Sequence, residues 1–476
     1  MEQEEWIVPT FNNQLRTDKP ILHYYFMRLG YMIFGVNALG ARFFSAVFGV
    51  LLLLLSYYFS SKILDKKTAW YQSLILLASL QFIVQFRLAV PDPYLIVFLY
   101  LTFIYVFKGL EEQKNILYAY IFAAFGFLTK GLIAIVLPGI VAIVYLLWTK
   151  RFTFSTLKTL RIPEGLLIFL CIGLPWYIAV GVKTKGEWLN GFFLKHNLER
   201  YTSTMEGHHG FFLLPFLLIV VALLPYSLFA FPAIRKIFKA ETAPFIKYAL
   251  VVVVVIGLFF SFSKTMLPTY IGPAIPFLAV ILGSYLSMTK PPSIKKYKPQ
   301  IIHLIFIIAL LIPLGSYFAI EGQAKMKHLS YLAIYLLPIT FGSVLAWFFW
   351  YKENKSAAVI SLTSAWGVGA IMFFSMIWPK LYVENPVHNS SHIWKEYDEI
   401  VAYKQFNPAF VWSAGKAIPV YDDLLSLEKA LKDGKVNTII ISRSKFKDEL
   451  IQLKKIEIIY EKNDLFEGSK TILLKY

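Results

Sequence analysis

The sequence predicts an all-α polytopic membrane protein with a small soluble α/β domain at its C-terminus. Its 476 residues are 57% hydrophobic, 17% aromatic and only 16% charged, a composition too apolar for a single water-soluble core. Apolar stretches near the length that crosses about 30 Å of hydrocarbon recur up to residue 378. After Trp378-Pro379 the pattern changes to short strand-like and helix-like segments.

About twelve apolar spans account for most of the membrane domain, which we place at residues 1–379. Some, such as 43–60, are nearly continuous, and others contain Pro or Gly, which membrane helices tolerate. The segment 21–37 is more amphipathic, with His23 and Arg28 among aromatic residues, so we expect a helix lying at the membrane interface. The predicted spans are 40–61, 69–87, 93–108, 115–130, 132–149, 165–182, 211–233, 247–263, 268–288, 300–320, 329–350 and 357–378.

The net charge of +18 is a signal of topology rather than of nucleic acid binding. Residues 380–476 hold 15 Lys and Arg against 14 Asp and Glu, so nearly all of the excess lies in the membrane domain. Between residues 61 and 356, one alternating set of loops carries 19 Lys and Arg and the other set carries 9. This bias is the positive-inside pattern. It assigns to the outer side residues 1–20, 87–92, 183–210, 264–268 and everything after 379.

Residues 380–476 are expected to form a small α/β domain outside the cytoplasm. VNTIIIS (436–442), IEIIYEK (456–462) and the final KTILLKY are typical of strands, and SLEKALKDG (426–434) is typical of a helix that ends at its glycine. The single cysteine, Cys171, lies in an apolar span and cannot form an intramolecular disulfide, so we interpret it as a packing residue.

Five stretches carry polar or proline-rich motifs at the predicted outer ends of the spans. They are 6–49 (containing TDKPILHYYF), 86–101 (FRLAVPDPYLIVFLYL), 123–147 (containing FLTKGL), the long loop 174–215, and 262–283 (containing KTMLPTYIGPAIP). In this order they resemble the bacterial aminoarabinose transferases and protein O-mannosyltransferases, membrane glycosyltransferases of the GT-C fold. The resemblance covers most of residues 6–290. It implies sugar transfer from a polyprenyl phosphate, at the outer face of a bacterial inner membrane, to lipid A, another envelope glycan or a protein.

A polyprenyl-phosphate donor keeps its lipid in the bilayer and its sugar at the interface, so the site should lie at the outer ends of helices. Its phosphate leaving group requires cations or a metal ion. The cations Lys19, Arg200 and Lys264 suit this role, and the resemblance implies phosphate contacts for Lys19 and Lys264. It also makes Asp18 a candidate catalytic and metal-binding acid. The alternative for Asp18-Lys19-Pro20 is an exposed turn before the interfacial helix.

The second acidic residue of the family falls on Asp92, as a group that contacts the acceptor or a metal. Arg87, Lys130 and Tyr270 are the further candidates for substrate binding. Alternatives from the residues alone are a structural ion pair between Arg87 and Asp92, snorkelling of Lys130 to the interface, and a packing role for Tyr270.

Histidines of the long loop suggest a divalent metal, Zn²⁺, Mg²⁺ or Mn²⁺, as a cofactor. His196 and His208 could join Asp18 as ligands, because neutral imidazole and carboxylate both bind such ions. The spacing of His196 and Arg200 would place both on one helical face. The alternative is that they are ordinary solvated loop residues, which we favour for His209.

Two other functions compete with glycosyl transfer. A transporter or flippase would place ionisable residues in mid-membrane and would show paired broken helices, whereas the charges here crowd one face. A non-catalytic relative that binds polyprenyl phosphate gains weight because family members carry an Asp-Glu stretch, on a first transmembrane helix, before the segment matched by EEWIVP. We therefore expect a preceding span in the complete protein. The alternative sources of that acid are Glu2, Glu4 and Glu5.

Overall fold

The structure is a computed structural model, and it divides into two compact units. It describes residues 5–198, 211–239, 242–263, 267–288, 300–323, 326–433, 437–453, 456–465 and 468–476, with backbone alone for 195–198 and 300. The first unit comprises Met1–Pro9, Leu15–Leu310 and Pro338–Ala370, and the second comprises Thr10–Gln14, Leu311–Leu337 and Ile371–Tyr476.

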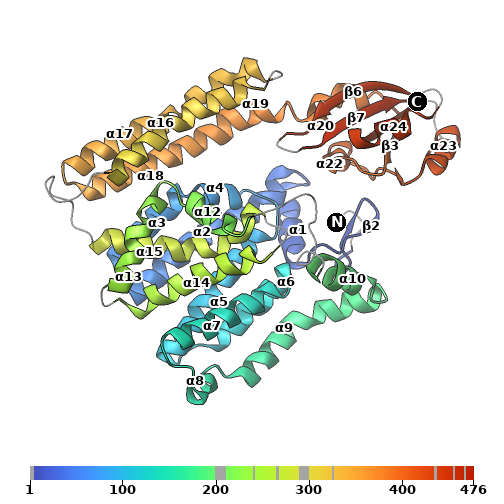
Figure 1. The fold of residues 1–476 in the computed structure, drawn as a ribbon. Coiled ribbons are helices and arrows are strands. Elements are labelled where there is room, and N and C mark those ends of the chain that lie inside the picture. The colour runs from blue at the N-terminus through green and yellow to red at the C-terminus, as the bar shows by residue number, and fades with distance from the viewer. Residues whose placement is uncertain are drawn as a thin grey trace. The chain divides into compact units, whose positions relative to one another are not determined.

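Helices make up nearly all of the first unit, as Figure 1 shows. In chain order, the helical elements up to residue 288 are α1 (Leu22–Phe34), α2 (Ala38–Ile63), α3 (Lys66–Ala78), α4 (Leu80–Gln85), α5 (Asp92–Glu112), α6 (Leu117–Lys130), α7 (Ile133–Trp148), α8 (Phe154–Thr159), α9 (Ile162–Lys183), α10 (Glu187–Asn190), η1 (Gly191–Leu198), α12 (Leu214–Ala222), η2 (Tyr226–Phe229), α13 (Ala230–Lys239), α14 (Pro244–Ser261), η3 (Pro268–Ala274) and α15 (Ile275–Met288). After them come α16 (Gln300–Glu321), whose second half belongs to the second unit, η4 (Lys327–Leu336), which lies wholly in the second unit, α17 (Leu337–Tyr351) and α18 (Lys355–Met372).

Each of the twelve predicted spans overlaps between one and three helical elements. Among the described residues, eight helices are long and apolar enough to cross a membrane, and a ninth span is possible if the pair Leu214–Ala222 and Tyr226–Lys239, bent by 114°, counts as one. Helices α6 and α7 are apolar but shorter. The predicted span 69–87 is broken at Ser79, whose hydroxyl accepts a hydrogen bond from the Phe82 backbone and so caps α4.

Helix α5 lies at the centre of the first unit. Of its most apolar window, 89% is buried inside the protein, because Tyr, Phe, Leu and Ile face outward from it in every direction. Helix α6 follows after a short connection, and α5, α6 and α7 lie side by side in Figure 1. The polar residue that begins α5, Asp92, is therefore buried as well.

The second unit contains a five-stranded sheet with the order β4-β3-β5-β7-β6. Its strands are β3 (Glu399–Tyr403), β4 (Val420–Tyr421), β5 (Thr438–Arg443), β6 (Glu457–Asn463) and β7 (Lys470–Lys475). Strand β3 pairs in parallel with β4 and β5, and β7 runs antiparallel to β5 and β6. Successive residues of β3 enter two different apolar clusters, as expected where both faces of a sheet are buried.

The remaining helices of the second unit are short. They are η5 (Phe373–Ile377), α19 (Trp378–Tyr382), α20 (Pro386–Asn389), α21 (Ser391–Trp394), α22 (Ala409–Ala414), α23 (Leu424–Asp433), η6 (Ser444–Phe446) and α24 (Lys447–Leu450). The strands and the helix predicted from the sequence near the C-terminus correspond to β5, β6, β7 and α23, while β3 and β4 were not predicted.

A small hairpin in the N-terminal loop also belongs to the second unit. Strands β1 (Thr10–Phe11) and β2 (Gln14–Leu15) are joined by Asn12 and Asn13, whose φ angles are 53° and 62°. Two-residue hairpin turns of this type need positive φ at both positions, which asparagine adopts more readily than most residues. The Asn12 side chain donates to the carbonyl of Ile418 at 2.8 Å and accepts from its N–H at 2.7 Å.

Candidate active site

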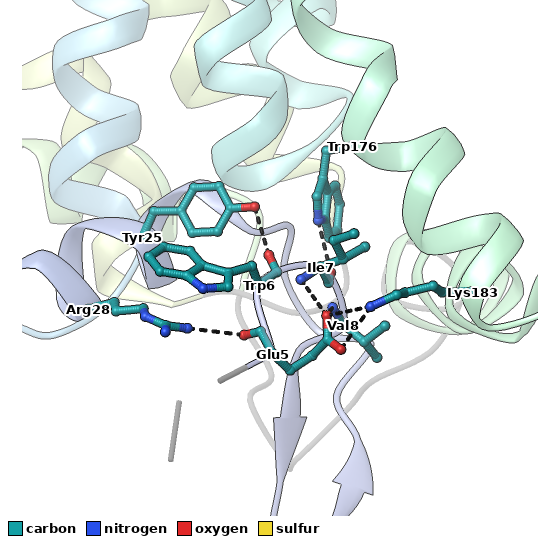
Figure 2. Close-up of polar contacts among 8 residues, drawn as sticks. All are labelled: Glu5, Trp6, Ile7, Val8, Tyr25, Arg28, Trp176 and Lys183. Carbon is teal, nitrogen blue, oxygen red and sulfur yellow. Dashed lines mark hydrogen bonds and ion pairs between the residues drawn. The ribbon is translucent and has the colours of Figure 1, made fainter. Parts of the chain in front are cut away.

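The start of the N-terminal loop is held by side chains from two helices, as Figure 2 shows. Tyr25 of α1 donates to the carbonyl of Trp6 at 2.7 Å, and Trp176 of α9 donates to the carbonyl of Ile7 at 2.9 Å. The guanidinium carbon of Arg28 lies 3.4 Å from the centre of the Trp6 ring, which is a close cation–π contact. These contacts fix the path of the loop between α1 and α9.

Glu5 is a structural anchor of this loop rather than a substitute catalytic acid. Its carboxylate lies 2.9 Å from Nζ of Lys183 and also accepts from the backbone N–H groups of Ile7 and Val8. The hydrogen bond from Lys183, followed by those from the backbone, lowers the pKa of Glu5 to about 2. A carboxylate with so low a pKa is a poor proton acceptor at neutral pH, so the structure disfavours Glu5 as a general base.

Asp18 and Lys19 lie at the end of the same loop, just before α1. The Asp18 carboxylate pairs with Nε of Arg16 at 3.2 Å and is 37% exposed. Nζ of Lys19 donates to the backbone carbonyl of Asp18 at 2.9 Å. These two candidate residues therefore sit together at a partly open position, with the charge of Arg16 beside the carboxylate.

His23 is a buried neighbour whose role the sequence did not indicate. Nδ1 of its ring is 3.1 Å from the carbonyl of Pro20, and the side chain is buried in the first turn of α1. Burial, with the charges of Lys19 and Arg16 adding to it, lowers the pKa of His23 to about 3. The ring is neutral at physiological pH and holds the turn that follows Asp18-Lys19.

Asp92, Lys130 and Tyr270 form the second group of candidate residues. Nζ of Lys130 is 2.5 Å from Oδ1 of Asp92, and both side chains are only 12% exposed. The same ammonium lies 4.5 Å from the centre of the Tyr270 ring. Asp92 is the first residue of α5, Lys130 is the last residue of α6, and Tyr270 belongs to η3. Three candidates from separate parts of the sequence thus meet in one buried cluster.

This cluster decides between two of the alternatives left open by the sequence. The cation that pairs with Asp92 is Lys130, in place of the Arg87–Asp92 pair. The side chain of Lys130 is turned onto a carboxylate and a ring, which disfavours snorkelling of its ammonium group into solvent. Arg87 lies just after α4, where its backbone N–H donates to the carbonyl of Val84.

A ring stack connects the two groups of candidates. Phe26 of α1 stacks on Tyr94 of α5, with ring centres 4.8 Å apart and planes inclined by 10°. Tyr94 lies two residues after Asp92, and Phe26 lies in the helix that follows Asp18-Lys19. Helices α1 and α5 therefore pack together near the ends that bear the candidate residues.

The other candidates fall outside the described residues. They are Glu2, Glu4, Arg200, His208, His209 and Lys264, and of His196 only the backbone, within η1, is described. Within the described ranges, no group of three or more His, Cys, Asp and Glu side chains is arranged to hold a metal ion. The Asp18 carboxylate is engaged by Arg16. The metal site of Asp18, His196 and His208 stays a prediction.

Comparison with known proteins connects this geometry to a family. Residues 18–178, which begin at Asp18 and include Asp92 and Lys130, match the family model described as dolichyl-phosphate-mannose-protein mannosyltransferase. An uncharacterised protein of Aquifex aeolicus is 31% identical over 389 residues, which is 81% of this chain and 72% of that protein.

Named relatives and solved structures agree with that match. The undecaprenyl phosphate-α-4-amino-4-deoxy-L-arabinose arabinosyl transferase of Pseudomonas savastanoi is 29% identical over 59% of this chain, and the alignment spans 53% of the transferase. The crystal structure of ArnT from Cupriavidus metallidurans bound to undecaprenyl phosphate superposes with a TM-score of 0.80 at 18% identity, covering 100% of this chain and 91% of that one. The apo structure of ArnT gives a TM-score of 0.82.

The fold, the family match and the relatives lead to one conclusion. The chain is a multi-pass membrane protein with the architecture of ArnT. Its mannosyltransferase match begins at the Asp18-Lys19 pair and extends through the buried Asp92–Lys130 pair. It therefore belongs to the GT-C membrane glycosyltransferases, the family of the protein O-mannosyltransferases and the lipid A aminoarabinose transferases.

Proposed function

We propose that the protein transfers a sugar from a polyprenyl-phosphate donor to an envelope lipid, glycan or protein at the outer face of a bacterial inner membrane. The observation that carries this proposal is the cluster of Asp92, Lys130 and Tyr270, in which the Asp92–Lys130 ion pair lies at two helix ends within the segment matched to mannosyltransferases. Charges buried at helix ends are costly, and they are most often retained for function. The aminoarabinose transferases support the donor class by their name.

In the proposed reaction a nucleophile of the acceptor attacks the anomeric carbon of the sugar. The bond from that carbon to the phosphate oxygen breaks, and polyprenyl phosphate leaves with the bonding electrons. Lys19 is the proposed stabiliser of the phosphate, together with Arg200 and Lys264. The carboxylate of Asp92 is proposed to orient the attacking group by accepting its hydrogen bond, because hydrogen bonds to a charged carboxylate are strong, and the proton of that group passes to solvent.

The proposal places the site and the C-terminal domain outside the cytoplasm. The Lys and Arg bias supports this orientation, since the loops rich in these residues are expected to stay inside. An outward site also suits a donor whose sugar projects from the outer leaflet. The polar groups of the candidate site come from loops and helix ends that the bias assigns to that side.

The test is to incubate the purified protein in detergent with a panel of undecaprenyl-phosphate sugars and to measure released undecaprenyl phosphate by mass spectrometry. We expect release with at least one donor. Replacing Lys19 by Ala should lower turnover on the order of 10²–10³-fold, as is typical when one oriented group that stabilises developing charge is lost. Lys158→Ala removes an exposed lysine of α8 and serves as the matched control, with unchanged turnover expected.

Two results would contradict the proposal. Near-normal turnover in Lys19→Ala would reject the role of this cation. A folded wild-type protein that binds undecaprenyl phosphate but releases it from no donor would favour the non-catalytic relative.

A further inference from the structure

Helix α10 and the π-helical turn η1 form one continuous element that contacts residues next to both groups of candidate residues in the sequence. The element begins after α9 and spans Glu187–Leu198. Its residue Trp188 is fully buried, and Phe192 is 2% exposed. Their rings stack, with centres 4.9 Å apart and planes inclined by 21°. Such burial indicates that the face of the element that bears these two rings is packed into the first unit, whereas Leu194 on another face is exposed.

One side of the element holds the two residues that precede Asp18. The indole N–H of Trp188 donates to the carbonyl of Arg16 at 2.9 Å. Gly191 lies so close to Thr17 that a Cβ added to the glycine would be 2.7 Å from Cγ2 and Oγ1 of Thr17. Trp188 and Gly191 are three residues apart, so both project from one side of the element. The N-terminal loop is thus fixed at two successive residues, immediately before Asp18-Lys19.

Phe192, the next residue of the element, contacts the residue that follows Lys130. A Cβ added to Gly131, which follows Lys130, would lie 2.7 Å from Cζ of Phe192. Gly131 has a φ of +86°, a conformation that favours glycine, so the ring approaches the backbone where no side chain is accommodated. Adjacent residues, Gly191 and Phe192, therefore touch the neighbour of Asp18 and the neighbour of Lys130.

We infer that Trp188, Gly191 and Phe192 are positioning residues that set the distance between the Asp18-Lys19 loop and the Asp92–Lys130 pair. The inference rests on the proposed function, in which Lys19 stabilises the leaving phosphate while Asp92 acts on the attacking group. Lys19 and Asp92 must then both be held at fixed positions around one anomeric carbon. A displacement of about 1 Å in such an arrangement can cost on the order of 100-fold in rate.

Replacing Trp188 by Phe is the central test, because it removes the indole N–H and keeps an aromatic ring. The matched control is Trp366→Phe in α18, since the indole nitrogen of Trp366 is buried without a hydrogen-bond partner. We expect Trp188→Phe to lower kcat on the order of 10- to 100-fold with little change in the KM for the donor. Trp366→Phe should leave kcat and KM unchanged.

A second test exchanges steric bulk across the contact. Gly191→Ala pushes a methyl group into Thr17 and should lower kcat. Combining it with Thr17→Gly removes the opposing side chain and should restore kcat. Recovery in the double variant would show that the separation of the two segments matters, rather than either side chain alone.

Hydrogen–deuterium exchange gives a readout that does not depend on the proposed function. Trp188→Phe should speed exchange at the backbone amides of residues 15–19, whereas Trp366→Phe should not. Unchanged exchange in Trp188→Phe overturns the inference, and so does faster exchange with unchanged kcat, because Trp188 would then only pack. A wild-type protein inactive with every donor would refute the proposed function, while the exchange comparison would still decide whether Trp188 fixes the loop.

Discussion

Neutralising Asp92 and Lys130 separately and together distinguishes a structural ion pair from a catalytic carboxylate. The two charged atoms are 2.5 Å apart, and each side chain is 12% exposed. With an effective dielectric constant of about 20, their Coulomb attraction is about 7 kcal/mol, most of which offsets the cost of desolvating both groups. Removing one partner of a buried pair costs about 3–5 kcal/mol, because the remaining charge is left uncompensated. Asp92→Asn and Lys130→Met should each destabilise the protein by about 3 kcal/mol.

The double variant Asp92→Asn/Lys130→Met should recover most of that stability, because two neutral groups of similar size then face each other. Turnover is expected to behave differently. If Asp92 acts on the attacking group, the double variant stays on the order of 10²–10³-fold slower than wild type. Thermal unfolding in detergent measures the stability of each variant, and release of undecaprenyl phosphate measures its turnover.

The other end of α5 provides a matched control. Glu111 pairs with Arg151 at 2.5 Å, with side chains 20% and 41% exposed. Glu111→Gln/Arg151→Met removes an ion pair of the same length from the same helix and should leave turnover unchanged. Wild-type turnover in Asp92→Asn/Lys130→Met would refute a catalytic role for Asp92. An equal loss in the Glu111 control would show that any disturbance of α5 slows the enzyme.

Three further predictions concern the N-terminal anchor, the topology and the metal. The pKa of Glu5 in the folded protein is about 2, below its ordinary value of 4.5, so its stabilising contribution should be complete above pH 4.5 and fade as the pH falls towards 2. The difference in unfolding temperature between wild type and Glu5→Gln should therefore shrink between pH 4.5 and pH 2. A constant difference would contradict this prediction. Cysteines placed at Ser203 and Ser426, in a Cys171→Ala background, should react with a membrane-impermeant thiol reagent in spheroplasts, and protection until lysis would reverse the orientation. If Asp18 binds a divalent ion, chelation should lower activity and Asp18→Asn should weaken metal retention, whereas active protein without stoichiometric metal would exclude the ion.

The elements that were predictable from the sequence are those with long or repetitive apolar patterns. Length and hydropathy were enough for eight of the twelve predicted spans, which correspond to described helices long enough to cross a membrane, and β5 was recognisable from its run of three isoleucines, Ile439–Ile441. Strands β3 and β4 were missed because EIVAY has five residues and VY only two. Their positions depend on the pairing of β3 with β5 and of β4 with β3, which is information from across the chain rather than from the local pattern.

In the candidate site, too, the residue types were visible in the sequence but their contact partners were not. That Asp92 and Lys130 are charges at the ends of apolar spans is visible in the sequence. Their contact depends on how α5 and α6 pack. Trp188 and Gly191 gave no signal at all, because a tryptophan and a glycine near a membrane interface are ordinary. Only the closeness of Gly191 to Thr17 and of Phe192 to Gly131 reveals an element placed between two functional segments.

The location of the Asp92–Lys130 pair argues for transfer at an interface rather than passage through the membrane. Helices α5 and α6 are joined by residues 113–116, and so short a connection makes them antiparallel neighbours. The first residue of α5 and the last residue of α6 therefore lie at the same end. A carboxylate at a helix N-terminus and an ammonium at a C-terminus are each favoured by the helix dipole, by roughly 0.3–1 kcal/mol. Between these ends, residues 93–107 and 117–129 contain no Asp, Glu, Lys, Arg or His. A path for ions or charged substrates along these two helices would need charged groups at that depth, whereas a lipid-linked sugar meets the protein where this pair is.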